Sequence, residues 1–252
     1  MIALLYDNSF EGLLTAIFEI YEYKYTDVKI LSHQNIQNVL FGENNIVITN
    51  TEKADRVMLR IEKQLGANAI RQFLYAFASE DDDRETIISQ IIFYAIANPS
   101  ATILDDYSNP YVLQLSKWVK SVGREKHRME AFVRFELLKD AIYFATIRPD
   151  FDVLPLLVTH FKERYQDQKW LIYDEKRQYG IFYDLNEVTV VTLPDKKMLS
   201  KNKETIWHEA EVKYQNLWIE YFDHTNIKER KNTKLHLQHV PKRYWRYLTE
   251  KR

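Results

Sequence analysis

The sequence predicts an α+β fold, in which a small N-terminal α/β unit and a helical middle precede an antiparallel sheet with helices. The prediction rests on two changes of hydrophobic period. Strand-like and helix-like runs alternate over the first 50 residues, a helical period continues to residue 130, and a period of two follows from residue 131. Strands grouped together after a run of helices are typical of α+β proteins.

The first 50 residues predict a strand, a helix and two further strands. The apolar run IALLY (2–6) ends at Asp7-Asn8-Ser9, which supply cap residues before a helically spaced run from Leu13 to Tyr21. VKILS (28–32) and NIVIT (45–49) are β-branched runs flanked by turn residues, so both predict strands. A second helix is expected to start near Thr51.

Four or five helices are expected from there to residue 130. Their apolar residues recur at helical spacing, with breaks at Gly66, at Asp81-Asp82-Asp83 within the acidic run EDDDRE (80–85), and between Asn98 and Pro110. The apolar run IISQIIFYAIA (87–97) predicts a helix that is buried on more than one side.

Five strands, an intervening helix and a last long helix are expected after residue 131. The strand candidates are FVRFELL, DAIYFATI, KWLIYD, YGIFYD and EVTVVTL, and the intervening helix is DVLPLLVTHFKERY. This order predicts a mostly antiparallel sheet with a helix on one face. The last long helix should run from Lys203 to His224, with Trp207 on its apolar side. We therefore divide the chain into regions 1–120 and 121–225 and a basic aromatic tail, residues 226–252.

Composition limits the possible chemistry. The chain has 252 residues, no cysteine, and five glycines too far apart to form a Walker loop or a dinucleotide fingerprint. Without cysteine the chain itself supplies no thiolate nucleophile and no ligand for an iron–sulfur cluster. His208-Glu209 lacks the second histidine of a zinc helix, because Val212 stands in its place, so we expect neither a metal nor a cofactor. The first residues lack a basic stretch followed by a long apolar run, which predicts a cytoplasmic protein without a membrane anchor.

Positive charge gathers at the end of a nearly neutral chain. The net charge is -1, but the last 28 residues hold nine Lys and Arg against two acidic residues. Such a block indicates an acidic partner, and nucleic acid is one candidate. The acidic run 80–85 of the same chain is the alternative partner.

A second cationic cluster lies in GREKHRMEAFVRF (123–135). Helical spacing places Arg124, His127 and Arg128 on one face, with Arg134 nearby, and guanidinium groups hold phosphate or carboxylate through paired hydrogen bonds. The alternative is a solvated helix face on which Glu125 and Glu130 pair with these cations.

Asp150 and Asp152 lie between a strand and a helix. Asp152 is placed as an N-cap with Pro155 in the first turn, and Asp150 is placed to pair with Arg148. Acid–base catalysis with His127 is the alternative role for these carboxylates.

The tail combines cations with aromatic rings. Its proposed contacts are Lys228, Arg230, Lys231, Lys242, Arg243, Tyr244, Trp245 and Arg246. Cations neutralise phosphates and rings stack on unpaired bases, a combination that suits single-stranded or distorted DNA. The alternative is that apolar residues such as Val240, Trp245 and Leu248 dock the tail onto the fold, leaving its cations in solvent.

Three stretches carry a family resemblance over nearly the whole chain. They are residues 6–22, residues 122–135 with 147–184, and NIKERKN (226–232) with HVPKRYWRYL (239–248). They resemble a bacterial family of unknown biochemical role described as probable DNA metabolism proteins. The resemblance implies a gene beside that of a radical-SAM protein, and a related domain fused to a uracil-DNA glycosylase-like domain. It assigns no catalytic residue.

These observations favour an accessory nucleic-acid-binding protein in DNA modification or repair. Because this chain holds no cysteine, a radical-SAM partner would have to carry the cluster, while this chain binds substrate, partner or DNA. Two alternatives stay open. One is an enzyme that acts on a damaged or flipped nucleotide through His127 and Asp150 or Asp152, and the other is a protein-interaction scaffold.

Overall fold

A computed structural model describes residues 2–33, 43–99, 102–192, 207–225 and 232–251, and confirms the α+β class. The chain forms two units, Met1–Gly123 and Arg124–Arg252, each treated below by itself. Residues 226–252, predicted as a tail, are grouped with the second unit.

Unit 1 opens with a three-stranded parallel sheet of order β2-β1-β3. Its elements are β1 (Ile2–Tyr6), α1 (Phe10–Glu22), β2 (Val28–Ser32) and β3 (Glu43–Ile46). Ser9 caps α1 by accepting a hydrogen bond from the Gly12 amide, as the sequence predicts. β3 ends earlier than the predicted run 45–49, although the Val47 amide still donates to the Leu5 carbonyl at 2.8 Å. Asn50 then caps the next helix by accepting from the Lys53 amide.

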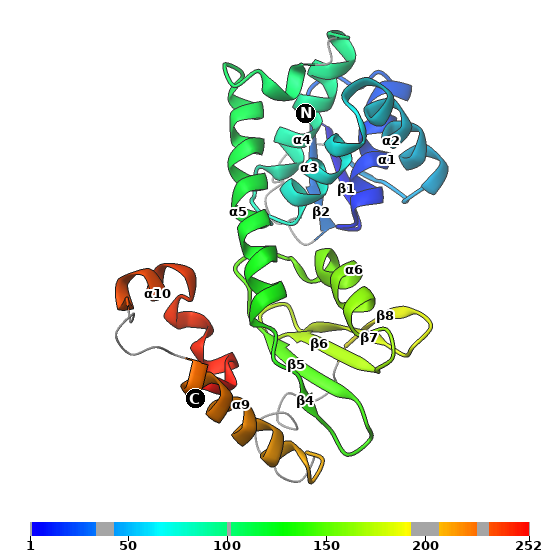
Figure 1. Cartoon of the computed structure of the whole chain (residues 1–252). Helices are drawn as coiled ribbons and strands as arrows, with labels where there is room; N and C mark the ends of the chain where they lie inside the picture. The colour runs from blue at the N-terminus through cyan, green and yellow to red at the C-terminus, as the bar shows by residue number, and fades with distance from the viewer. Residues whose placement is uncertain (1, 34–42, 100–101, 193–206, 226–231, 252) are drawn as a thin grey trace. The chain divides into compact units, whose positions relative to one another are not determined.

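Four α-helices follow within the described residues, and they confirm the predicted helical middle; the last of them continues past Gly123 into unit 2 (Figure 1). They are α2 (Thr51–Leu65), α3 (Ala67–Phe77), α4 (Arg84–Ala97) and α5 (Pro110–Phe132). Gly66 separates α2 from α3 at a φ of 84°, a conformation that favours glycine. Pro110 begins α5, where a missing amide donor costs nothing.

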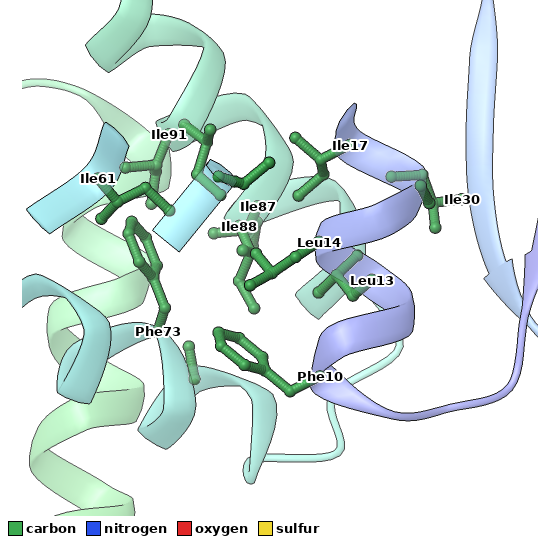
Figure 2. Close-up of a cluster of buried hydrophobic side chains, with 14 of the residues drawn as sticks. Phe10, Leu13, Leu14, Ile17, Ile30, Ile61, Phe73, Ile87, Ile88 and Ile91 are labelled. Atoms are coloured by element: carbon green, nitrogen blue, oxygen red, sulfur yellow. The ribbon is translucent and has the colours of Figure 1, made fainter. Parts of the chain in front are cut away.

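The core of unit 1 lies between α1 and the helices that follow it. Phe10, Leu13, Leu14 and Ile17 form the apolar side of α1, and Figure 2 shows them near residues of α2, α3 and α4, namely Ile61, Phe73, Ile87, Ile88 and Ile91. Ile87, Ile88, Ile91 and Ile92 are buried on one face of α4. Phe93 and Ile96, further round the helix, pack partly buried against the same core, so apolar residues are covered on more than one side, as predicted.

A buried ionic network connects β1 to the start of α4. The Tyr6 hydroxyl donates to the Glu85 carboxylate at 2.6 Å, and Arg84 Nε donates to the same carboxylate at 3.0 Å. Arg84 also packs over the Phe77 ring at 4.4 Å. Glu85, the last residue of the acidic run, is therefore engaged inside unit 1.

Unit 2 contains a five-stranded sheet of order β4-β5-β6-β7-β8. Its elements are β4 (Glu136–Leu137), β5 (Tyr143–Ile147), α6 (Leu154–Arg164), β6 (Trp170–Asp174), β7 (Tyr179–Tyr183) and β8 (Val188–Val191). β5 and β6 are parallel and joined through α6, whereas the other three pairs are antiparallel. α6 covers one face of the sheet, where Phe161 packs against Trp170 (Figure 1).

Two predicted boundaries in unit 2 are wrong. FVRFELL is not one strand, because α5 continues to Phe132 and Val133 still donates to the Met129 carbonyl, so the strand keeps only two residues. The last long helix, α9 (Glu211–Thr225), begins well after Lys203. Trp207, predicted to lie in this helix, instead forms an antiparallel β-bridge with Leu138, next to β4. Residues 203–206 lie outside the described part of the chain.

The end of the chain folds into short helices. They are α10 (Thr233–His239) and two 3₁₀ helices, Lys242–Tyr247 and Thr249–Lys251. The second of these 3₁₀ helices packs against α9.

Replacing Gly12 with alanine should destabilise unit 1. A Cβ atom there would collide with the Asp7 carboxylate and lie 2.9 Å from the hydroxyl oxygens of Ser9 and Thr49. Overpacking of this kind costs about 1–3 kcal/mol in the free energy of unfolding. Urea unfolding followed by circular dichroism measures the loss.

The matched control is Gly123→Ala, inside α5. Its Cβ would meet the Tyr75 ring at 3.4 Å, an ordinary contact, and alanine is the better helix former by about 1 kcal/mol. Equal stability of the two variants would show that the turn tolerates a side chain at Gly12.

Candidate anion-binding site

The end of the chain is docked onto unit 2 by two buried side chains. Tyr244 and Leu248 are each 1% exposed, and the Tyr244 ring packs against Phe132 at 5.4 Å between ring centroids. The sequence left docking and DNA contact open. For the described residues 240–251 docking is observed, with Tyr244 rather than Trp245 as the main anchor.

The carboxylate of Glu125 on α5 joins three parts of unit 2. It accepts a hydrogen bond from the Tyr244 hydroxyl at 2.5 Å and one from the Asp150 amide at 2.9 Å. Arg128 and Arg243 each approach its second oxygen at 3.5 Å. Because the Glu125 side chain is 1% exposed, these four donors replace the water that a buried carboxylate loses.

Tyr244 is held in its neutral form by the same contacts. Burial raises the pKa of Tyr244 well above its usual value, and the hydrogen bond to Glu125 raises it further. A phenol that keeps its proton stays a hydrogen-bond donor to Glu125 throughout the physiological pH range.

The loop between β5 and α6 is fixed by cations from the β6–β7 turn. Lys176 Nζ donates to the Asp150 carbonyl at 2.8 Å, and Arg177 donates to the Pro149 and Asp150 carbonyls at 3.3 and 3.1 Å. Arg177 is itself oriented by the fully buried Asp174, 2.7 Å away. Contacts to its backbone therefore fix this loop, and the side chains of Arg148 and Asp150 are exposed.

A cavity of about 430 Å³ opens where this loop meets the end of the chain. Its described lining residues are Arg148, Pro149, Asp150, Lys176, Arg243 and Arg246. Four cations thus surround one carboxylate. Both cation clusters that the sequence singled out reach this region, since Arg128 of α5 and Arg243 share the Glu125 carboxylate.

Carboxylates orient two of the four cations. Arg243 Nη2 lies 2.6 Å from Asp150 Oδ2, and its guanidinium packs over the Tyr244 ring at 4.5 Å. Arg246 forms an ion pair with Glu175, which also accepts from the Tyr247 hydroxyl at 2.7 Å. These cations are presented in defined positions, and defined positions lower the entropic cost of binding a ligand.

Arg148 is exposed, and within the described part of the chain it makes no hydrogen bond or ion pair. The predicted Arg148–Asp150 pair is therefore wrong, because Arg243 takes the Asp150 carboxylate.

The other predicted contacts between Arg124 and Arg134 have different surroundings. Arg124 and His127 are exposed, and His127 Nδ1 lies 3.6 Å from Glu130. Arg134 is paired with Glu250 at 2.8 Å and packs over Trp218, so it fastens α5 to later elements. Burial alone would raise the pKa of Glu250, but hydrogen bonds from Arg134 and Trp218 outweigh it and hold this pKa below its usual range.

The aromatic residues of the tail are mostly committed to the fold. Tyr244 is buried, and half-buried Trp245 donates through Nε1 to the Val240 carbonyl at 3.0 Å. Lys242 is exposed beside Trp245. Lys228, Arg230 and Lys231 lie outside the described residues.

The cavity does not assemble the predicted catalytic group. Asp150 lines it, whereas neither His127 nor Asp152 is among its described lining residues. Asp152 accepts from the Tyr179 hydroxyl at 2.5 Å instead. The N-cap of α6 is Val153, without a side-chain cap, so the capping role predicted for Asp152 is wrong, while Pro155 does lie in the first turn.

Arg148 and Lys176 were missed as cavity residues. They follow β5 and β6, which are adjacent parallel strands, so their carboxyl ends reach the same edge of the sheet. The order strand–helix–strand in the sequence favours parallel pairing of these two strands, and it could have indicated that Arg148 and Lys176 lie close together.

The fold and the cavity define the class: an α+β protein with a cation-lined binding cavity. A family model for a domain of unknown function, DUF4130, matches residues 82–250, more than half of the chain. The chain therefore belongs to the DUF4130 family, and the match includes every described cavity residue. No curated protein matches this chain.

Two further features hold for the residues that the structure describes. No group of three or more His, Asp or Glu side chains there is arranged to hold a metal ion. The helices of these residues also lack the combined length and apolar character that crossing a bilayer requires.

Replacing Tyr244 with phenylalanine should destabilise unit 2, because it takes one of four donors from a buried carboxylate. The expected loss is about 1–3 kcal/mol in the free energy of unfolding. Urea unfolding followed by tryptophan fluorescence reports mainly on this unit, which holds Trp170, Trp207, Trp218 and Trp245.

Tyr247→Phe is the control. It removes the same hydroxyl from a bond to Glu175, whose side chain is 42% exposed, and should cost no more than about 0.5 kcal/mol. Similar losses in both variants would argue against the Glu125 junction as the main anchor.

Proposed function

We propose that this protein is an accessory nucleic-acid-binding protein in DNA modification or repair, and that unit 2 contacts the phosphate backbone. The observation that supports it is the cavity of about 430 Å³ with Arg148, Lys176, Arg243 and Arg246 in its lining. Arginine and lysine supply the contacts on which backbone binding depends, and arginine matches phosphate geometry through paired donors.

Binding of this kind would be independent of base sequence. The described lining residues include no aromatic ring and no amide side chain that could read a base edge. Exposed Arg124, His127 and Lys242 would extend the contact beyond the cavity. We propose single-stranded or distorted DNA as the ligand, because it brings phosphates into a concave site more easily than a straight duplex.

The catalytic step in this proposal belongs to a partner. The chain has no cysteine, so a radical-SAM protein acting with it would hold the iron–sulfur cluster. We propose a uracil-DNA glycosylase-like protein as a further partner, and the cytoplasm as the place where these proteins act. This chain would position the nucleic acid for them.

A protein-interaction role is the second candidate, and α9 favours it. This helix leaves large apolar side chains in solvent, among them Tyr214 at 55%, Leu217 at 50% and Tyr221 at 60% exposed. Contiguous apolar exposure of this kind is typical of a protein contact surface. The two roles are compatible, since α9 contributes none of the described cavity residues.

Salt dependence tests the nucleic-acid proposal. Fluorescence anisotropy with a labelled single strand should give a log affinity that falls steeply with log salt. The double variant Arg148→Gln/Lys176→Gln should reduce that slope by about 1.4, because each phosphate contact on a single strand contributes about 0.7.

The matched control is Lys139→Gln/Arg164→Gln, which removes the same charges from exposed positions outside the described lining. It should keep the wild-type slope. A wild-type slope near zero would rule out backbone binding. Co-purification with the radical-SAM protein, with and without DNA, tests the proposed partnership separately.

A further inference from the structure

We propose that the cavity holds a terminal phosphate of a nucleic-acid strand, a phosphomonoester, in preference to a phosphodiester within the strand. The proposal rests on the proposed function and deepens it, since it names which phosphate the same site takes. It would make this protein a recognition module for strand ends and nicks that carry a 5′ or 3′ phosphate.

The charge of the cavity favours a dianion. Four cations line it with Asp150, and Glu175 engages Arg246 from outside the lining. Positive charge stays in excess after each carboxylate offsets one cation. A terminal phosphate carries about -1.5 to -2 at pH 7, whereas a diester carries one negative charge, so the attraction to the same cations is nearly doubled.

Asp150 lowers the affinity of the cavity for any anion. Its carboxylate lies in the lining and repels any phosphate that enters. It also holds Arg243 at 2.6 Å, so a phosphate has to compete for that guanidinium. The net positive charge that remains still attracts a monoester more strongly than a diester, because the monoester has the larger charge and a third terminal oxygen.

The donors are arranged around an open position. Lys176 is held by the Asp150 carbonyl, Arg243 by Asp150 and Glu125, and Arg246 by Glu175. Arg148, with no hydrogen bond or ion pair to another described residue, has its guanidinium available to a ligand. Three oriented cations and one available guanidinium suit an anion with three accepting oxygens.

Size and lining agree with a terminal nucleotide. A volume of about 430 Å³ exceeds what one phosphate needs, and it falls in the range of about 300–1,000 Å³ that is usual for small-molecule sites. The sugar of the last nucleotide therefore fits beside its phosphate. Without an aromatic ring in the described lining, the base is left unread, so ends of any sequence should bind.

The test compares single strands of one sequence that differ in their ends: hydroxyl at both ends, 5′-phosphate, or 3′-phosphate. Anisotropy at fixed salt should show one or both phosphorylated strands binding about tenfold more tightly than the hydroxyl strand, because the terminal phosphate adds charge and an accepting oxygen for charged hydrogen bonds. Arg148→Gln should reduce that preference toward onefold, whereas Arg164→Gln should leave it unchanged. Both arginines are exposed, so circular dichroism should show both variants folded.

The outcomes separate this proposal from the proposed function. If all three strands bind equally, end recognition is overturned and nucleic-acid binding stands. If none binds, both fall. Competition by inorganic phosphate and by a free mononucleotide completes the test. If either competitor binds as tightly as the phosphorylated strand and displaces it, the cavity is a small-anion site and recognition of strand ends is overturned.

Discussion

The buried carboxylate of Glu125 is the constraint on which unit 2 depends. Taking a charged group out of water costs several kcal/mol unless donors replace the lost hydration. The required donors come from three places far apart in sequence: Arg128 on the same helix, the amide of Asp150, and Tyr244 with Arg243 near the end of the chain. Docking of the last residues thus supplies donors to the buried carboxylate on α5, and it also buries apolar surface.

The same constraint orients the cations of the cavity. In a 3₁₀ helix residues three apart lie on one side. Within Lys242–Tyr247 this places Arg243 and Arg246 together, while Tyr244 enters the fold and donates to Glu125. Docking and presentation of positive charge are therefore two results of one arrangement. A tail that bound DNA through Tyr244 would have to give up its main anchor.

Unit 1 uses its buried charges differently. Arg84, Glu85 and Tyr6 satisfy one another between β1 and α4, with Phe77 against the guanidinium. The sequence offered the acidic run 80–85 as a partner for the basic tail. In the structure, Arg243 and Arg246 pair within unit 2, with Glu125, Asp150 and Glu175.

The sequence by itself determined the α+β class, most elements and the two cationic segments, because hydrophobic period and cap residues are local properties. Only the tertiary structure decided what those segments do. Parallel pairing of β5 with β6 places Arg148 and Lys176 at one sheet edge, and burial of Glu125 draws in Tyr244 and Arg243. These contacts depend on which distant elements pack together, and the local spacing of residues does not determine which residues will pair with a buried charge.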